Sequence, residues 1–307
     1  MKNIKTLVLF LVLTSTIAVT ATAQERGQYL PGFRGLNSSE QPPPGFTYAN
    51  YLFWYPAGKL KGHDGRTATS DIDIDLVADT NIFAYTPKKK FLGGTYSATV
   101  VVPIQNIAFT LPNVGASLKT GAGHGDIYVE PFSLNWKLKK GKVRTGYGFL
   151  APTGRYNVGA ADNLSTDFWG HQIMVGGTYN PDKLGLWQLN ASSVWEAHHK
   201  KRHADVRVGN NVTFEYSVGR TFVKSQGQKL IQVGLVGYSE FQLTDDRGTG
   251  VVPPNLGNKD SVHALGGEFG VIIPAKKLNF VFRAIPEYGA RSRTQGVTIV
   301  VGFGKTF

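Results

Sequence analysis

The stretch Asp71-Ile72-Asp73-Ile74-Asp75-Leu76 alternates strictly between carboxylates and aliphatic side chains. In an extended strand, successive side chains point to opposite faces, so the three aspartates share one face and the three aliphatic residues share the other. A soluble β-sandwich rarely buries a row of three carboxylates or exposes such an aliphatic row. The stretch therefore indicates a strand with its apolar face toward lipid and its carboxylates toward a polar interior.

The same alternation appears in other parts of the chain. One set places Trp187, Leu189, Ala191 and Trp195 opposite Gln188, Asn190, Ser192 and Glu196, and another places Leu278, Phe280 and Phe282 opposite Asn279 and Arg283. The apolar positions also carry aromatic side chains near the ends of the segments, as in an interfacial girdle. One segment changes phase after Ile127 and Val129, which predicts a β-bulge near Glu130-Pro131.

The chain from residue 45 onward divides into about twelve such segments. Each is long enough to cross a bilayer as a tilted strand of roughly 9 to 11 residues. After residue 23, no stretch approaches the roughly 18 uninterrupted apolar residues that a transmembrane helix needs, so a membrane-spanning form must be a barrel. The predicted strands are 45–55, 71–85, 93–109, 125–138, 142–151, 168–179, 185–197, 206–222, 229–243, 261–273, 277–287 and 296–307.

The connections between these strands alternate in length. The short ones are 86–90, 139–141, 180–183, 224–227 and 274–276, and the long ones are 56–70, 110–124, 152–167, 198–205, 244–260 and 288–295. Outer-membrane barrels alternate in this way, with short periplasmic turns and longer extracellular loops. We therefore predict an all-β fold for residues 45–307: a transmembrane antiparallel up-and-down β-barrel of about twelve strands in the outer membrane of a Gram-negative bacterium.

The first 23 residues have the pattern of a secretory signal peptide. Lys2 and Lys5 precede an apolar run over 7–13 and a cleavage-like Ala21-Thr22-Ala23. The 37 glycines and the 12% aromatic content suit an all-β chain better than a helical one. The absence of cysteine excludes disulfides, thiolate metal sites and cysteine nucleophiles.

Residues 24–44 contain many Gly and Pro residues, have no periodicity and end in Pro42-Pro43-Pro44. We expect an irregular N-terminal arm here. It can plug the lumen from the periplasmic side, with Tyr29, Leu30 and Phe33 buried, or it can be a flexible tail.

The charge balance is basic after the signal segment. Subtracting Lys2 and Lys5 from 33 basic residues leaves 31 against 21 acidic ones, a net charge of +10. The lysines fall in scattered turns rather than in one stripe with aromatic residues, which argues against nucleic acid. The expected partners are outer-membrane lipids and lipopolysaccharide, the barrel assembly machinery and a small-molecule solute. We expect no cofactor.

Several motifs together resemble the outer-membrane family named for the phenol meta-degradation pathway, a group of channel or transporter barrels. They are Gly27-Gln28-Tyr29-Leu30-Pro31-Gly32, Pro42-Pro43-Pro44-Gly45-Phe46, Gly125-Asp126-Ile127-Tyr128, Tyr147-Gly148-Phe149-Leu150-Ala151-Pro152-Thr153-Gly154-Arg155-Tyr156 and Phe168-Trp169-Gly170-His171-Gln172. The resemblance spans nearly the whole chain after the signal segment. It implies a barrel that passes hydrophobic or aromatic compounds.

Charged residues on the predicted inward faces are candidates for lining the lumen. They are Asp71, Asp73, Asp75, Asp79, Glu130, Arg144, Arg207, Glu215, Glu240, Arg283 and Glu287. They can form a charged constriction that selects solutes, or a closed polar network that fills a narrow barrel. If the charged residues form a constriction, the aspartate row is expected to attract cations.

Two loop motifs carry further candidates. Arg155 and Tyr156 can turn inward over the pore mouth, or they can belong to a tight turn at Gly154. His198, His199 and His203 share a loop, but Lys200, Lys201 and Arg202 lie among them and oppose a metal cation. We therefore predict no metal site, and a basic loop that is either solvated or in contact with lipopolysaccharide phosphate.

The favoured function is an outer-membrane channel for passive uptake of small hydrophobic or aromatic molecules. The alternatives are a closed structural or adhesive surface barrel and a membrane-embedded lipid-modifying enzyme. No nucleophile elbow or orienting acid accompanies Ser192 and Ser193 near His198 and His199, so we expect no enzyme and no catalytic residues. Phe307, which ends an alternating strand, is expected to act as an assembly signal.

Overall fold

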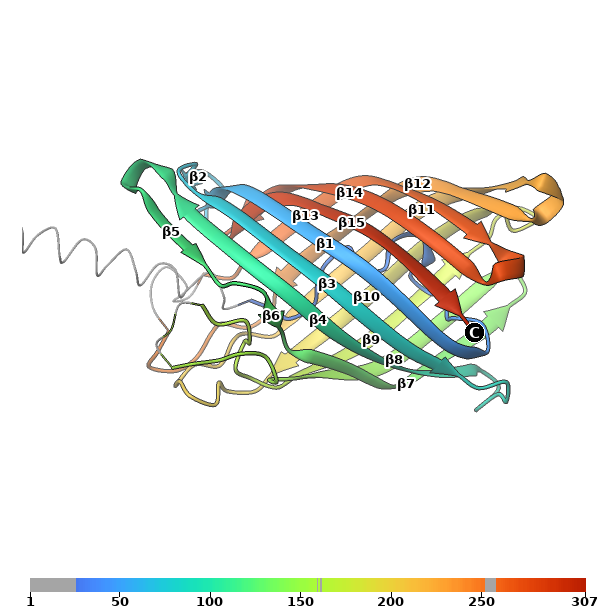
Figure 1. Ribbon diagram of the computed structural model, residues 1–307, viewed down its shortest axis with the longest axis horizontal. Coiled ribbons are helices and arrows are strands. Elements are labelled where there is room, and N and C mark those ends of the chain that lie inside the picture. The colour runs from blue at the N-terminus through green and yellow to red at the C-terminus, as the bar shows by residue number, and fades with distance from the viewer. Residues whose placement is uncertain (1–25, 159, 161, 252–257) are drawn as a thin grey trace, which may run out of the picture.

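The computed structural model describes residues 26–158, 160, 162–251 and 258–307. In this part of the chain, twelve long antiparallel strands form one closed sheet (Figure 1). Each strand pairs with its neighbour in the sequence, and β15 pairs with β1, which confirms the predicted barrel. The strands are β1 (Gly45–Lys61), β3 (Asp73–Thr86), β4 (Thr95–Leu111), β7 (Ile127–Leu138), β8 (Gly141–Ala151), β9 (Gly170–Tyr179), β10 (Trp187–His198), β11 (Asn211–Lys224), β12 (Lys229–Gln242), β13 (Ser261–Ile273), β14 (Leu278–Arg291) and β15 (Thr294–Thr306).

The connections give the barrel two different ends. Short turns lie at the end that carries the C-terminus, and longer loops lie at the other end (Figure 1). Three short strands extend the sheet at the loop end: β2 (Thr67–Thr69), β5 (Ala116–Lys119) and β6 (Gly123–His124). The predicted long loop over 288–295 is wrong, because β14 continues to Arg291 and β15 begins at Thr294, which leaves a two-residue turn.

The remaining regular structure in the described chain is four 3₁₀ turns: η1 (Gly35–Asn37), η2 (Pro112–Val114), η3 (Ser225–Gly227) and η4 (Pro274–Lys276). In η2 and η4 a proline occupies the first turn and the following residue, Gly115 or Lys277, caps the turn in the left-handed conformation. No helix among these residues has the length and apolar character needed to cross a membrane.

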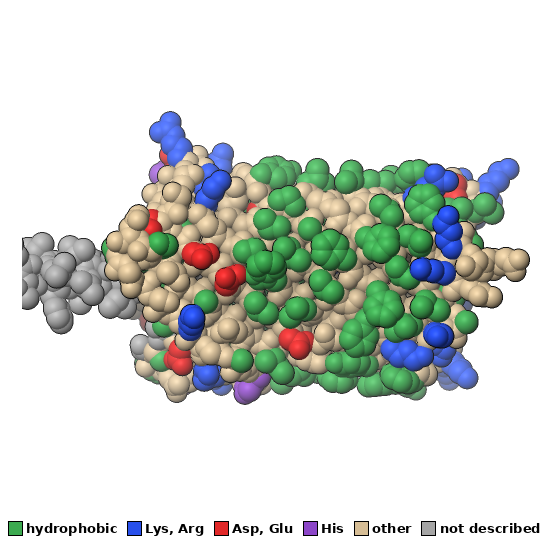
Figure 2. Space-filling model, turned by 45° about the horizontal axis from the view of Figure 1, so that its top comes forward, with side chains coloured by type: hydrophobic (Ala, Val, Ile, Leu, Met, Phe, Trp, Pro, Cys, Tyr) green, Lys and Arg blue, Asp and Glu red, His purple; other side chains and the backbone are tan. Residues whose placement is uncertain are grey.

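The outer surface carries a belt of apolar side chains. Figure 2 shows them covering the middle of one face, with lysines and arginines gathered toward both ends. In β10 the predicted alternation is confirmed, since Trp187, Leu189 and Trp195 are exposed whereas Gln188 and Glu196 are buried. Other exposed apolar side chains are Leu52, Trp54, Phe83, Ile104, Ile173, Leu235, Phe269 and Phe282.

The predicted bulge near Glu130-Pro131 is also present. The register of β7 with β8 shifts between Val129 and Phe132, and its register with β4 shifts at Ser97/Thr99. The shift lets the apolar phase change while Glu130 and Ser133 both face the interior, where they are buried.

The seam between β1 and β15 closes the barrel beside Phe307. The Phe307 amide donates to the Phe46 carbonyl at 2.8 Å, and the two rings stack with centroids 6.4 Å apart. The ring of Phe307 is exposed. Its role as an assembly signal stays a prediction.

Candidate functional site

The described part of the N-terminal arm, Arg26 to Pro44, lies inside the barrel, and a carboxylate of the wall holds its backbone. Glu215 on β11 accepts hydrogen bonds from the Tyr29 hydroxyl at 2.7 Å, from the Gly32 amide at 2.8 Å and from the Arg34 amide at 3.1 Å. Glu196 on β10 accepts from the Gln28 and Tyr29 amides at 3.0 and 2.9 Å. Because an irregular segment has no ladder partners, these carboxylates satisfy amides that would otherwise be unpaired.

The centre of the arm fits into the wall at η1. The side chain of Leu36 is fully buried against Gly219 of β11 and Gly234 of β12. A Cβ atom built on these glycines would lie 2.6 and 2.7 Å from Leu36 Cδ2, so the hollow exists because both positions lack a side chain. The Leu36 carbonyl accepts from Asn190 at 2.9 Å, and its amide donates to Glu268 at 3.0 Å.

An ion pair on β13 and β14 reaches the arm on either side of Gly35. Arg283 Nε lies 2.7 Å from Glu268 Oε2, and Arg283 Nη1 donates to the carbonyls of Gly32 and Phe33. Gly35 has φ +56° and a Cβ there would lie 1.9 Å from Glu268 Oε2. Only glycine allows both this backbone conformation and this approach.

We call the following inward side chains of β10 to β14, each of which hydrogen-bonds the arm, the polar wall: Glu196, Glu215, Gln232, Glu268 and Arg283. The apolar side chains on the inward face of β1, β3 and β4 form the apolar wall: Phe53, Leu76, Ala78, Ile82 and Val101. Thr47, Thr80, Thr99 and Gln105 lie on the same face and also line the lumen. The arm touches the apolar wall through Leu30 and Phe33, which pack against the cluster of Phe53, Ala78 and Val300. The Phe33 and Phe53 rings stack with an interplanar angle of 1° and centroids 5.7 Å apart.

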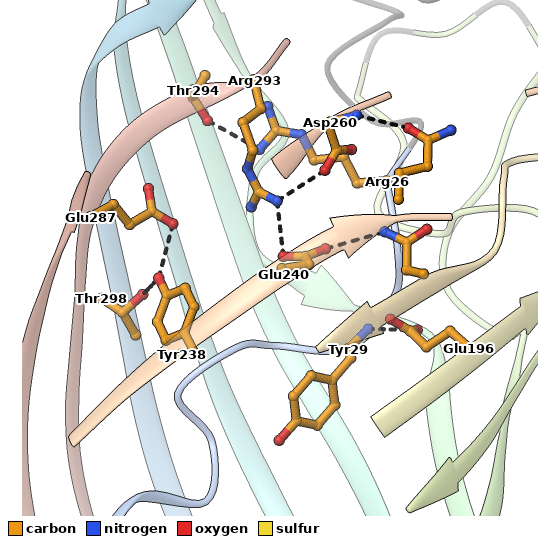
Figure 3. A network of polar contacts seen from close by, with 12 residues as sticks. Arg26, Tyr29, Glu196, Tyr238, Glu240, Asp260, Glu287, Arg293, Thr294 and Thr298 are labelled. Carbon is orange, nitrogen blue, oxygen red and sulfur yellow. Dashed lines mark hydrogen bonds and ion pairs between the residues drawn. The ribbon is translucent and has the colours of Figure 1, made fainter. Parts of the chain in front are cut away.

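A charged network at the loop end joins the arm to neighbouring strands on one side of the barrel (Figure 3). Arg293, in the turn before β15, donates to Glu240 at 2.9 Å and to Asp260 at 3.3 Å. Arg26 of the arm donates to Thr294 beside it at 3.1 Å. Burial raises the pKa of Asp260 above its ordinary value, although the charge of Arg293 opposes this.

The neighbouring part of the network is built from hydroxyl groups around Glu287 of β14. Tyr238 and Tyr55 donate to its two carboxylate oxygens at 2.9 and 2.7 Å, and Tyr238 also lies 3.1 Å from the Thr298 hydroxyl. These contacts join β1, β12, β14 and β15, which lie on one side of the lumen, so the network braces that side of the barrel.

A second charged cluster joins the arm to β7 and β8. Arg144 Nη2 lies 2.6 Å from Glu130 Oε1, and Arg144 Nη1 donates to the Glu40 carbonyl at 3.1 Å. Lys142 pairs with the Glu40 carboxylate. Arg34 of the arm lies 3.8 Å from Glu130.

A cavity of about 1160 Å³ remains beside the arm. Asn180, Gly185 and Lys277 line it at the turn end, whereas Asn163, Thr166 and Arg293 line it at the loop end. The arm's Tyr29, Leu30 and Phe33 also line it, as do residues of both walls. The lumen therefore holds an elongated cavity that runs from one end of the barrel toward the other.

The predicted aspartate row does not line this cavity. The pairing of β3 with β1 places Ile74, Leu76 and Ala78 on the inward face, and this puts Asp73, Asp75 and Asp79 on the outward face. Asp71, just before β3, is half-buried and accepts from the Asn113 amide at 2.9 Å. Trp54, also outward, donates to Asp75 at 2.7 Å. The face assignment is wrong because the lumen here contains the apolar residues of the arm: Leu76 faces inward and packs on the same cluster as Leu30 and Phe33.

The prediction that Arg207 lies on an inward face is also wrong, because Arg207 is exposed in the loop before β11. There its Nε donates to the His198 carbonyl at 2.9 Å. The other six candidates do face the lumen: Glu130, Arg144, Glu215, Glu240, Arg283 and Glu287. Their functional role stays a prediction.

The loop residues predicted at the pore mouth brace other loops instead of lining the cavity. Arg155 Nη2 donates to the Asp162 carbonyl at 2.9 Å and to the Thr120 carbonyl of a neighbouring loop. The Tyr156 ring stacks on His203 with centroids 5.5 Å apart. In the same loop it is residues 163–166 that line the cavity.

The three loop histidines have different partners. His198 is buried and its Nδ1 lies 2.8 Å from the Gly209 carbonyl. His199 faces His171 with 3.1 Å between the two Nε2 atoms, and His203 bonds Asp167 at 2.8 Å. In the basic loop between them, Lys200 pairs with Asp205, and its hydrogen bond holds the pKa of Asp205 well below the ordinary value.

Sequence reasoning missed several residues of the site. Glu196 was placed on the polar face of its segment but not proposed for the site, and Glu268 carries the same signal of inward phase. Gly219 and Gly234 were detectable only as glycines inside strands, which often mark close approach of another segment. Arg26, Arg34 and Arg293 lie outside the strands, so no periodicity identifies them.

The chain matches the model of a family described as "Putative MetA-pathway of phenol degradation" over residues 57–303. No curated protein matched the sequence. Among solved structures, the fold is similar to the COG4313 outer membrane channel from Pseudomonas putida F1, with a TM-score of 0.74 and 12% identity, over 91% of this chain and 100% of that one. It is also similar to the β domain of the Bordetella autotransporter BrkA, with a TM-score of 0.55 and 11% identity, over 86% of this chain and 100% of that one. The family match covers most of the chain, and the chain therefore belongs to the phenol MetA-pathway family.

Proposed function

We propose that this protein is an outer-membrane channel for passive uptake of small, hydrophobic or aromatic molecules. The observation that carries the proposal is the elongated cavity beside the arm, which has the apolar wall on one side. Membership of a family named for phenol degradation supports the solute class, and likeness in fold to an outer membrane channel supports a channel.

In this proposal the arm is the plug. It narrows the lumen, while Leu30 and Phe33 continue the apolar surface of Phe53 along the cavity. An apolar solute that moves along this surface keeps apolar contact and does not need to displace water from carboxylates. The polar wall, in turn, holds the plug.

The barrier to such solutes is the lipopolysaccharide leaflet. The test therefore uses vesicles with lipopolysaccharide in the outer leaflet and follows entry of radiolabelled toluene with and without the purified barrel. We expect faster entry with the protein than with an unrelated closed barrel at the same density. Equal rates would favour the alternative, a closed structural or adhesive barrel.

The hydrolase alternative has little support in the geometry. Ser192 and His198 lie on the same face of β10 but six residues apart, which is roughly 20 Å along a strand. Ser193 faces outward, where its hydroxyl accepts from Trp195. Lipopolysaccharide phosphate groups as partners of the basic loop over 199–207, and the assembly machinery as a partner of Phe307, are further parts of the proposal.

A further inference from the structure

The turn end of the barrel carries far more positive charge than the rest of the chain. It comprises the five turns, the strand residues beside them and the last residues of β15: 86–95, 137–142, 179–187, 220–229, 273–278 and 305–307. These residues include 14 lysines and arginines but one acidic residue, Asp182, which gives a net charge of +13. The other residues after position 23 include 17 basic and 20 acidic ones, which gives −3. The basic character of the chain therefore comes from one end of the barrel.

This positive charge surrounds the barrel. Each of the five turns carries at least one lysine in the turn or directly beside it, and β15 adds Lys305, so that basic side chains gather at the right-hand end in Figure 2. Exposed aromatic side chains, such as Tyr85, Tyr179 and Phe307, lie at the same end. In outer-membrane barrels an aromatic girdle marks the membrane interface. A charge distribution on all sides at this level fits a lipid leaflet better than a protein that docks on one side.

One part of this charged end is held in place by aromatic rings. Trp187 of β10 pairs in register with Arg220 of β11 on the outward face. The Arg220 guanidinium lies 5.5 Å from the centroid of the Trp187 ring and 5.1 Å from the centroid of the Phe222 ring. Such contacts stabilise a cation on an aromatic surface. Arg220 is therefore positioned on the outside of the barrel with its charge exposed.

Two lysines follow Arg220 toward the turn on the same outward face. Lys224 ends β11 and pairs in register with Lys229, which begins β12. Like charges directly opposite each other on a sheet repel. Arg220, Lys224 and Lys229 are all exposed, and none of the ion pairs among the described residues includes them. We call these three residues the basic cluster; an anion bound between them would relieve their repulsion.

An apolar surface adjoins the basic cluster on the side of the membrane. Leu189 of β10, Val218 of β11 and Leu235 of β12 pair with one another in register, and all three are exposed on the outward face. They lie two positions farther from the turn end than Arg220 and its partners. The same three strands therefore present positive charge at the rim and aliphatic side chains directly beyond it. A ligand that matches both has an anionic head and an apolar body.

We propose that the basic cluster is a headgroup site for an anionic phospholipid of the periplasmic leaflet, whose acyl chains lie on the adjoining apolar surface. Short turns of outer-membrane barrels face the periplasm, where the leaflet consists of phospholipid, whereas lipopolysaccharide occupies the other leaflet. The phosphodiester accepts hydrogen bonds from guanidinium and ammonium groups. The site goes beyond the proposed function, because it concerns how the barrel is seated in its membrane and not which solute it passes.

The test uses the full-length barrel in phospholipid vesicles and measures quenching of tryptophan fluorescence by brominated lipids. Brominated phosphatidylglycerol is the anionic probe, and brominated phosphatidylethanolamine is the probe without net charge. Both leaflets have the same composition, so both ends of the barrel meet the same lipids. The parent should associate with phosphatidylglycerol about five- to tenfold more strongly, and about 0.5 M NaCl should reduce this preference. The preference should belong to the part of the signal that Trp187→Phe removes, because Trp187 contacts the basic cluster.

Changing the whole basic cluster to Gln should make the two lipids associate about equally. The matched control changes three exposed basic residues at the loop end, Lys59→Gln, Lys119→Gln and Arg291→Gln together, and should keep the preference of the parent. If the cluster variant is not heat-modifiable and therefore not assembled, the double variant Lys224→Gln with Lys229→Gln decides, and it should lose the preference by a few-fold. Equal association of both lipids with the parent, or an equal loss in the loop-end control, would overturn the site. Toluene entry tests the channel separately, so either proposal can fail while the other stands.

Discussion

The polar wall and the apolar wall of this barrel enclose the same lumen but treat the arm differently. The polar wall binds the arm through directional contacts, from Glu215 to backbone amides and from Arg283 to backbone carbonyls. The apolar wall touches it through the stacked rings of Phe33 and Phe53. Hydrogen bonds fix a position, whereas apolar contact is non-directional. One wall therefore positions the plug, and the other is left as a surface for solute.

Removing the arm should produce the largest effect, and it tests whether the two walls have these different roles. Deletion of residues 26–44 leaves a lumen with both walls free, and the single-channel conductance should rise several-fold over that of the parent. The barrel itself should still assemble, because its ladder is closed by β1 and β15. Planar-bilayer recordings check the conductance, and unchanged conductance would mean that the arm does not limit permeation.

A single carboxylate should control much of the attachment. Glu215→Ala leaves the Tyr29 hydroxyl and the amides of Gly32 and Arg34 without their acceptor, at a cost of about 2 to 4 kcal/mol in the free energy of holding the arm. The arm should become accessible to protease in the assembled barrel. Glu215→Gln keeps one acceptor oxygen and should show a smaller effect. Equal protection of the arm in all three proteins would contradict the role of this wall.

Replacing a glycine that contacts Leu36 tests how the wall seats the arm without changing any charged residue. A Cβ in Gly219→Ala would lie 2.6 Å from Leu36 Cδ2, and the three nearest atoms all belong to the Leu36 side chain, so η1 must move at a cost of about 1 to 3 kcal/mol. The matched control is Gly267→Ala, where the nearest atom would be 3.9 Å away. Hydrogen exchange of the Leu36 amide should speed up in Gly219→Ala and not in the control. The same rate in both variants would show that the hollow does not seat the arm.

Acidification should affect the charged network around Arg293 at the loop end by a modest amount. Because the pKa of Asp260 is raised, the folded barrel binds its proton more tightly than the unfolded chain does. Its contribution to stability therefore grows as pH falls through the raised pKa, is complete below the ordinary value of 3.8, and is lost as pH rises. Relative to Asp260→Asn, the parent should gain thermal stability between pH 7 and pH 4. Parallel melting curves across this range would refute the assignment.

The outward aspartates should produce the smallest effect. Asp73 and Asp75 are exposed on the face opposite Leu76, so changing both to Asn should leave ion selectivity unchanged and alter stability by about 0.5 kcal/mol or less. Reversal potentials under a salt gradient measure this. A loss of cation preference would indicate that these aspartates face the lumen, against the register of β3.

The sequence predicted the strands more reliably than the faces. The bounds of β7, β8, β12 and β13 agree with the prediction to within about two residues, because period-2 alternation and turn residues are local signals. The rule that apolar residues face lipid failed at β3, where the apolar face packs on the arm and not on the membrane. Only the tertiary position of the arm decides between these faces, and that position depends on Glu215 and Gly234, which lie far from it in the sequence.

The seam beside Phe307 has a consequence for the order of assembly. The strands that meet there, β1 and β15, are the first and last of the barrel to be synthesised, and the arm leads directly into β1. Until β15 arrives, the sheet is an open trough and the arm can lie against Glu196 and Glu215 from the side. After the seam forms, the arm can enter only by threading through an end of a filled lumen. We therefore expect the arm to bind inside the open sheet first and the barrel to close around it afterwards.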